Sequence, residues 1–305
     1  MTIMFGSHLS IAGGLHNALI EAGRLEMDCV QVFTKNQRQW SSGPLSDEQL
    51  ATWHEHRRRA KLRSIVSHDS YLINLAGPTG PTRRKSIALL RDELDRCEQL
   101  KIGQLVTHPG AHVNAGGERA GLKRVAAALD RVHRDLPGYR VITSLEVTAG
   151  QGTNLGYRLE HLKQIIDRVR EPERLSVCLD TAHLLAAGYD LESAAGMRDV
   201  LDQVERILGL ERVAVVHVND SRTGRSSRVD RHEHIGKGHV CLEALAVLVN
   251  HARIRRLPKI LETPKGTGPG GRDWDAVNLA RLRRMVKVPR SPAVRSAART
   301  PRRSA

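Results

Sequence analysis

Eight short apolar runs occur along the chain, and longer amphipathic or charged stretches separate them. Short runs that alternate with helix-length stretches are typical of β-α-β units, which build a parallel sheet. An open sheet also gives this alternation, but eight units in one domain-sized chain fit an α/β TIM (β/α)8 barrel better. The runs cover residues 4–8, 29–34, 64–68, 104–108, 141–146, 176–180, 213–217 and 259–262.

The stretches between the runs predict helices, and this pattern ends near residue 288. We therefore expect a single barrel domain at 1–288. The segment 289–305 is dominated by Arg, Ser, Pro and Ala, which bury too little apolar area to offset the entropy of ordering. It is predicted to be a disordered, Arg-rich basic tail. The predicted helices include residues 83–101, 118–135, 159–170, 191–208, 241–252 and 274–286.

The formal net charge of +15 favours a polyanionic partner, because basic surfaces attract phosphate backbones. The segment 289–305 holds five Arg and no acidic residue, so the rest of the chain carries 15 − 5 = +10. Charge alone is weak support for nucleic-acid binding, since a basic composition is common in proteins that never contact DNA.

Composition indicates a globular protein of the cytoplasm. Hydrophobic residues make up 40% of the chain, yet no apolar run is long enough to span a membrane. The first residues lack the basic and apolar regions of a secretory signal. The cysteines have no CxxC spacing or pairing pattern, which predicts buried, reduced thiols rather than disulfides or a cysteine zinc site. They are Cys29, Cys97, Cys178 and Cys241.

Besides the run that ends in His8, six of the eight apolar runs finish with a His, Asp or Glu, and these six are the candidate ligands. In a barrel these strand ends point to one face, where enzymes of this architecture keep their active sites. Imidazoles and carboxylates that converge without matching Lys or Arg are best explained by a bound cation, because buried unpaired charges are costly. Nitrogen and oxygen donors without thiolate suit zinc, with manganese or iron as alternatives. The six are His68, His108, Glu146, Asp180, His217 and Glu262.

Two further segments extend this set to nine candidate ligands. His183 follows Asp180 by three residues, close to one helical turn, so both can face one site. Asp230 and His232 are two residues apart, which places them on one side of an extended loop. Nine ligands are too many for one tetrahedral zinc and suit three ions that share bridging carboxylates.

The other histidines carry weaker expectations. Those near the same face are interpreted as supporting or merely polar groups, namely His8, His112, His234 and His239. Those on helical stretches are expected to be solvated, namely His16, His54, His56, His133, His161 and His251.

Long motifs make the chain resemble the endonuclease IV family of zinc-dependent apurinic/apyrimidinic endonucleases, from near its start to about residue 288. The resemblance implies a TIM barrel, in agreement with the strand count. The matching segments are GSHLSIAGGL, FTKNQRQW, HDSYLINLA, HPGAH, TAGQGTNLG, CLDTAHLLAAGYD, VHVNDS, SRVDRHEHIGKG and LETP.

The resemblance implies three Zn²⁺ ions per chain, with Glu146 bridging the first two. Departures from the family pattern at Ser67, Ala182 and Val147 lie beside ligands and remove none; they can alter metal affinity through neighbouring contacts. The three implied ligand groups are His68, His108 and Glu146; Glu146, Asp180, His217 and Glu262; and His183, Asp230 and His232.

The resemblance also implies an activity in base excision repair. The enzyme would hydrolyse the phosphodiester 5′ to abasic sites in duplex DNA, leaving 3′-hydroxyl and 5′-deoxyribose phosphate ends. Glu146 would orient or deprotonate the attacking water. Arg38, Tyr71 and Leu72 match residues that insert into DNA at the lesion; alternatively, Tyr71 and Leu72 only pack the barrel rim. A monomer, associated with the nucleoid through DNA binding, is the default expectation.

Two rival functions remain open at this point. A sugar isomerase or epimerase shares barrel architecture and His, Asp and Glu metal sites, but normally needs fewer ions. A noncatalytic DNA-binding or lesion-sensing protein would keep the fold without the chemistry. The intact set of nine ligands argues against the second rival.

Overall fold

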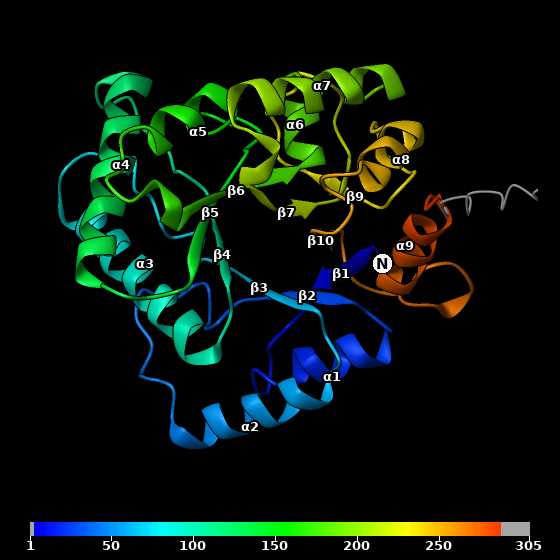
Figure 1. Cartoon of the computed structure of the whole chain (residues 1–305), viewed down its shortest axis with the longest axis horizontal. Coiled ribbons are helices and arrows are strands. Elements are labelled where there is room, and N and C mark those ends of the chain that lie inside the picture. The colour runs from blue at the N-terminus through cyan, green and yellow to red at the C-terminus, as the bar shows by residue number, and fades with distance from the viewer. Residues whose placement is uncertain (1–2, 288–305) are drawn as a thin grey trace, which may run out of the picture.

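Eight parallel strands close into a barrel in the computed structural model, which describes residues 3–287 (Figure 1). Their order around the barrel is β1-β10-β7-β6-β5-β4-β3-β2, which confirms the closed barrel over the open sheet. The predicted tail at 289–305 lies outside the described residues. The strands are β1 (Met4–His8), β2 (Cys29–Val32), β3 (Ser64–His68), β4 (Gln104–Thr107), β5 (Ile142–Glu146), β6 (Leu175–Asp180), β7 (Val213–His217) and β10 (Pro258–Leu261).

Helices surround the barrel (Figure 1). The six predicted helices are confirmed as α3, α4, α5, α7, α8 and α9, although α5 ends at Ile166 rather than at residue 170. The helices are α1 (Asn17–Arg24), α2 (Asp47–Arg59), α3 (Pro81–Leu100), α4 (Gly117–Asp135), α5 (Leu159–Ile166), α6 (Thr181–Ala187), α7 (Ala194–Ile207), α8 (Leu242–Asn250) and α9 (Trp274–Arg284), with short 3-10 turns at Pro172–Arg174, Leu210–Arg212 and Pro269–Gly271.

Helix α2 has a weak apolar pattern, and Trp53 is its only buried residue. Its start is nevertheless marked by a capping box, in which Ser46 and Gln49 bond each other's backbone amides. The Trp53 indole donates to the Leu100 carbonyl at 2.9 Å, which ties α2 to α3. One buried aromatic and a cap thus replace the usual apolar stripe.

An apolar layer fills the barrel beneath the predicted ligands. Side chains two apart on a strand point to the same side, and five residues of this layer each stand two positions before a candidate ligand. Val66 precedes His68 in this way, and Ile260 precedes Glu262. The candidate ligands therefore lie one layer above these apolar side chains, at the carboxyl ends of the strands. The layer comprises Met4, Cys29, Val66, Val106, Cys178, Val215 and Ile260.

All four cysteines are free thiols. Cys29, Cys97 and Cys178 are buried as predicted, whereas Cys241 is partly exposed and donates to Glu243. In the described part of the chain, no helix has both the length and the apolar character needed to cross a bilayer.

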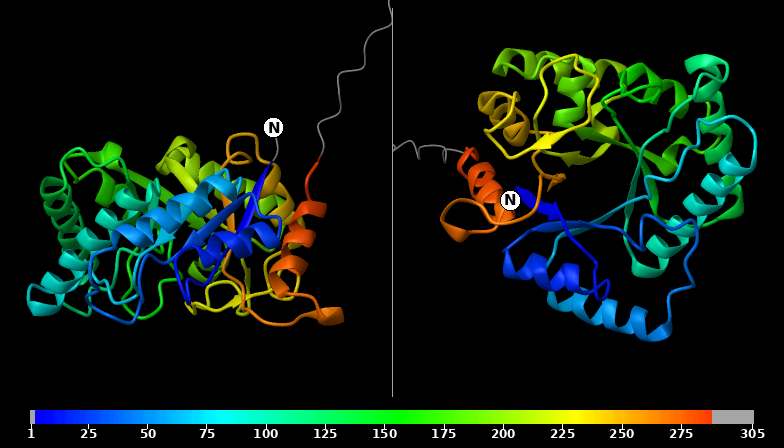
Figure 2. Two further views of the ribbon diagram at one scale, coloured as in Figure 1. Left: turned by 90° about the horizontal axis from the view of Figure 1, so that it is seen from below. Right: turned by 180° about the vertical axis from the view of Figure 1, so that it is seen from behind.

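A short antiparallel ribbon that the sequence did not predict follows β7. It pairs β8 (Asp220–Ser221) with β9 (His232–Glu233). The ribbon lies with the loops that follow the strands, at the lower end of the left-hand view in Figure 2, and β1 begins at the opposite end. This ribbon brings Asp230 and His232 to the same end of the barrel as the strand-borne ligands.

Burial in the apolar layer predicts how much stability is lost when a cavity is made below the candidate ligands. Ile260→Ala removes a fully buried side chain and should lower the free energy of unfolding by about 2–5 kcal/mol. Ile20→Ala, on the exposed face of α1, should change it by less than about 0.5 kcal/mol. Urea unfolding of both variants measures this; equal stabilities would contradict the assigned layer.

Candidate metal centre

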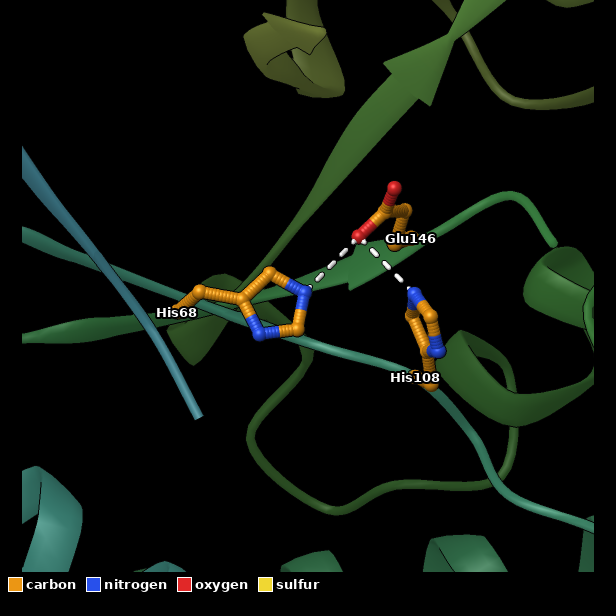
Figure 3. Close-up of side chains that lie close together, drawn as sticks. All are labelled: His68, His108 and Glu146. Carbon is orange, nitrogen blue, oxygen red and sulfur yellow. Dashed lines mark hydrogen bonds and ion pairs between the residues drawn. The ribbon is translucent and has the colours of Figure 1, made fainter. Parts of the chain in front are cut away.

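The Glu146 carboxylate lies at the centre of the predicted cluster. This residue ends β5 and is completely buried. Its Oε2 lies 3.2 Å from Nε2 of His68 and 3.2 Å from Nε2 of His108, so both rings point at one oxygen (Figure 3). The first predicted group is therefore assembled from three neighbouring strands.

The second carboxylate oxygen of Glu146 faces the other side of the cluster. Oε1 lies 3.0 Å from Nδ1 of His217 and 3.1 Å from Nδ1 of His183. The same His217 nitrogen is 3.1 Å from Glu262 and 3.8 Å from Asp180. Glu146 is thus positioned to bridge two groups of donors.

The remaining candidates gather around His183. Asp180 caps α6 by accepting from the His183 amide, which fixes the predicted one-turn spacing. Nε2 of His183 lies 3.2 Å from Asp230 and 3.4 Å from Nε2 of His232. Asp180 also lies 3.6 Å from His232 and so stands between the second and third groups. All nine predicted ligands are brought together.

The donor spacing fits zinc. A tetrahedral zinc with bonds of about 2.0–2.1 Å holds neighbouring donor atoms roughly 3.3 Å apart. The contacts in the cluster range from 3.0 to 3.9 Å. Cys178 lies within reach of Glu146 and His217, but burial raises the pKa of its thiol to about 12, which favours the neutral form. The nitrogen and oxygen donors are therefore the ones suited to an ion.

Opposite charges stabilise each other throughout the cluster. Burial raises the pKa of the Glu146 carboxyl, but the imidazoles of His217 and His108 outweigh burial and hold it well below its ordinary value. Burial lowers the pKa of His68, yet the Glu146 carboxylate raises it to about 9. Positive charge on the imidazole nitrogens therefore stabilises the carboxylates that face them. Metal ions would supply the same positive charge, and their binding would release protons from these imidazoles.

Four imidazoles of the cluster are oriented through their other ring nitrogen. His68 donates through Nδ1 to the Asp69 carbonyl at 2.8 Å, and His183 donates to the Val147 carbonyl at 2.9 Å. His232 donates to the Glu262 carbonyl at 3.2 Å. A carbonyl only accepts, so these nitrogens carry the hydrogen and leave the opposite lone pair for a metal.

Gln31 orients the fourth ring and is a site residue that sequence reasoning missed. Its side-chain oxygen accepts from Nε2 of His217 at 2.8 Å, and its amide donates to Glu262 at 2.6 Å. Gln31 stands two residues after Cys29, which belongs to the apolar layer. The same period-two rule that places the ligands would have placed it.

Asn219 and His8 complete this surrounding set. Asn219 donates to Asp180 at 2.7 Å and accepts from the Glu262 amide at 2.7 Å. His8 lies 3.3 Å from Glu262, as expected for a supporting group.

The three departures from the family motifs all lie in buried positions. Ser67 donates to the Val32 carbonyl at 3.1 Å, and Ala182 lies in the first turn of α6. The Val147 carbonyl accepts from His183 at 2.9 Å. This acceptor belongs to the backbone and does not depend on the chemistry of the side chain at position 147.

A cavity of about 290 Å³ lies over the cluster and adjoins one of about 760 Å³. Tyr71 lines both and is 64% exposed, with its ring 5.5 Å from His68. Leu72 is half-buried against the core, and Arg38 is exposed on the loop after β2. Tyr71 and Arg38 are thus free to contact a ligand, whereas Leu72 also packs the rim.

Two predictions about histidines were wrong. His133 and His161 are buried rather than solvated. His133 is the last buried residue of α4. His161 accepts a hydrogen bond from the Gly156 amide, and its other ring nitrogen is hydrogen-bonded to Arg158. Their burial depends on how each helix packs against its neighbours, so helical periodicity alone did not reveal it.

Comparisons with known proteins identify the family of the chain. Residues 19–285 match the family model described as Xylose isomerase-like TIM barrel. "Probable endonuclease 4" of Chloroflexus aggregans is 46% identical over 284 residues, which cover 93% of this chain and 98% of that protein. The crystal structure of endonuclease IV from Thermus thermophilus superposes with a TM-score of 0.80 at 35% identity, covering 92% of this chain and 98% of the other.

The chain belongs to the endonuclease IV family. A D-tagatose 3-epimerase-like protein superposes with a TM-score of 0.68 at 20% identity, over 93% of this chain and 97% of the other. That likeness concerns the fold alone. The barrel alone therefore does not determine the function, which depends on the residues at its mouth.

Gln31 offers a direct test of the orienting contacts. Gln31→Leu keeps the side-chain size but removes the acceptor for His217 and the donor to Glu262. Zinc affinity should fall about 10–100-fold, as is usual when such supporting contacts are lost. Competition with a chromogenic chelator measures it, with Gln164→Leu on α5 as control. Unchanged affinity in Gln31→Leu would refute the orienting role.

Proposed function

We propose that this protein is a zinc-dependent endonuclease of DNA repair, which hydrolyses the phosphodiester 5′ to abasic sites in duplex DNA. The products are a 3′-hydroxyl and a 5′-deoxyribose phosphate. The observation that carries the proposal is the convergence of nine residues with nitrogen and oxygen donors at zinc spacing, eight of them grouped around Glu146 and Asp180 and the ninth, Asp230, beside His183. Membership of the endonuclease IV family supports the choice of DNA as substrate.

Two of the three proposed ligand groups share Glu146, and the third consists of His183, Asp230 and His232. Bound zinc supplies Lewis acidity, which makes water a nucleophile at neutral pH and offsets charge on the phosphate. The Glu146 carboxylate, held between four imidazoles, is the base proposed to orient the attacking water. His68, His183, His217 and His232 keep their lone pairs inward through the bonds of their other nitrogens.

Recognition of the lesion is assigned to the rim. Tyr71 projects beside the cluster, and its exposed ring can fill the space left in a base stack. Flipping a nucleotide out of the stack costs least where its base is already missing. A ring that fills the vacated space therefore favours abasic sites. Lys35, Lys265 and Arg231 line the adjoining cavities and are suited to phosphate contacts. Arg38 and Leu72 complete the proposed wedge.

The rival functions differ in measurable ways. A sugar epimerase with this fold has little use for an exposed aromatic ring or for Asp230 and His232, and it would load fewer ions. A content near three zinc ions per chain favours the nuclease. A noncatalytic binder would retain abasic DNA without cutting it.

The central test is cleavage of a duplex that carries one abasic site. Native protein should cut on the 5′ side, and a zinc chelator should stop the reaction. Glu146→Gln should lower kcat by about 10²–10³-fold or more, because it removes the central charge. Glu160→Gln on the surface of α5 is the control. Near-normal cutting by Glu146→Gln would refute the assignment of Glu146.

The ring of Tyr71 provides a separate test of recognition. Tyr71→Ala should lower kcat/KM for the abasic duplex by about 5–150-fold, which corresponds to about 1–3 kcal/mol of lost stacking. Tyr71→Phe keeps the ring and should remain near normal. Hydrolysis of bis(p-nitrophenyl) phosphate should be unaffected in both. Equal losses in the Ala and Phe variants would mean that stacking is not the function of Tyr71.

A further inference from the structure

Two of the proposed ligands stand outside the barrel strands. Asp230 precedes β9 and His232 begins it, and β9 pairs with β8 through only two residue pairs. The other seven are at strand ends or, for His183, in the helix that follows directly. Something other than the strand ladder must therefore fix the segment 230–240.

Asp220 provides this fixation from inside the molecule. It is completely buried, and within residues 3–287 no basic side chain pairs with its carboxylate. Its two oxygens instead accept five backbone N–H groups. The donors are Gly236 at 2.9 Å, Lys237 at 3.1 Å and Gly238 at 2.9 Å on Oδ2, and Ser221 at 2.8 Å and Val240 at 2.8 Å on Oδ1.

The glycines let the backbone come this close. A Cβ at Gly238 would lie 2.2 Å from the Ser221 carbonyl oxygen and 2.5 Å from Oδ1 of Asp220. Gly236 has a φ of +73°, a conformation that other residues rarely adopt. The turn is therefore shaped around the carboxylate.

The same turn is joined directly to the ligands. Asp220 pairs with Glu233 and Ser221 pairs with His232 across the ribbon. The His239 amide donates back to the Ser221 carbonyl at 2.9 Å. Displacement of the turn would therefore displace His232 and its neighbour Asp230.

Helix α9 holds the outer side of this segment. The ring of His234 stacks on Trp274 with centroids 3.6 Å apart. Asn278 accepts from the Ile235 amide at 3.2 Å and donates to His234 at 3.1 Å. The segment is thus held between α9 and the buried carboxylate.

We propose that Asp220 is a positioning residue for the ion bound by His183, Asp230 and His232, although it does not contact that ion. This inference rests on the proposed zinc-dependent function. A carboxylate makes strong, charge-assisted bonds to backbone amides. An Asn side chain has one accepting oxygen, and its NH₂ group would face N–H donors, so Asp220→Asn must release part of the turn.

The test compares zinc content and amide exchange in native protein and Asp220→Asn. Both are loaded with zinc, exchanged into metal-free buffer and measured by native mass spectrometry. Native protein should hold three ions per chain and Asp220→Asn two. Hydrogen exchange should show lost protection at 236–240 in the variant. Glu98→Gln is the matched control, because that carboxylate accepts the Arg140 and Val141 amides before β5.

The outcomes separate the two proposals. Three ions in native protein and also in Asp220→Asn would overturn the role of Asp220 and leave the proposed function standing. Failure of native protein to load zinc would overturn the proposed function together with this inference. If Asp220→Asn does not fold, Gly238→Ala replaces it, since it displaces the amides and keeps the carboxylate. Gly238→Ala should lose one ion, and full loading would refute the proposal.

Discussion

The candidate site depends on three carboxylates gathered at the mouth of the barrel, Glu146, Asp180 and Glu262, and no Lys or Arg of the described residues pairs with them. Glu146 and Asp180 are fully buried, and Glu262 is nearly so. Burying a carboxylate costs several kcal/mol unless hydrogen bonds and an opposite charge compensate it. Imidazoles surround these groups in place of permanent cations, and imidazole is the side chain that gives up its proton most readily to a metal. In this arrangement, protons on the imidazoles can be exchanged for bound metal ions as the source of positive charge.

The barrel supplies the geometry for this cluster. Parallel strands in register bring distant residues to one level, and the two-residue period sets an apolar layer directly below them. The layer excludes water from beneath the donors, which strengthens each electrostatic contact above it. A D-tagatose 3-epimerase-like protein shares this fold, and a fold alone does not determine the reaction. Tyr71 and the β8–β9 ribbon are the features on which the proposed action on DNA rests.

Much of the site could be predicted because its information is local. Each strand-borne ligand follows its own apolar run, so position on the strand sufficed to place His68 or His217. Gln31 obeyed the same rule but was missed, since an amide is not a metal ligand and its partners lie 186 and 231 residues away. Burial of His161 was missed for a related reason. Its shielding depends on contacts between loops and helices, which no periodicity within one segment records.

The proposed ligands also differ in what keeps them in place. A strand-end ligand inherits its position from the barrel ladder, which is among the most stable parts of such a fold. Asp230 and His232 lie on a loop, and loops position side chains less accurately unless packing and hydrogen bonds restrain them. Asp220 and α9 supply that restraint from opposite sides. The group proposed with His183 is therefore expected to depend on Asp220 and α9, whereas the groups proposed around Glu146 depend on the whole barrel.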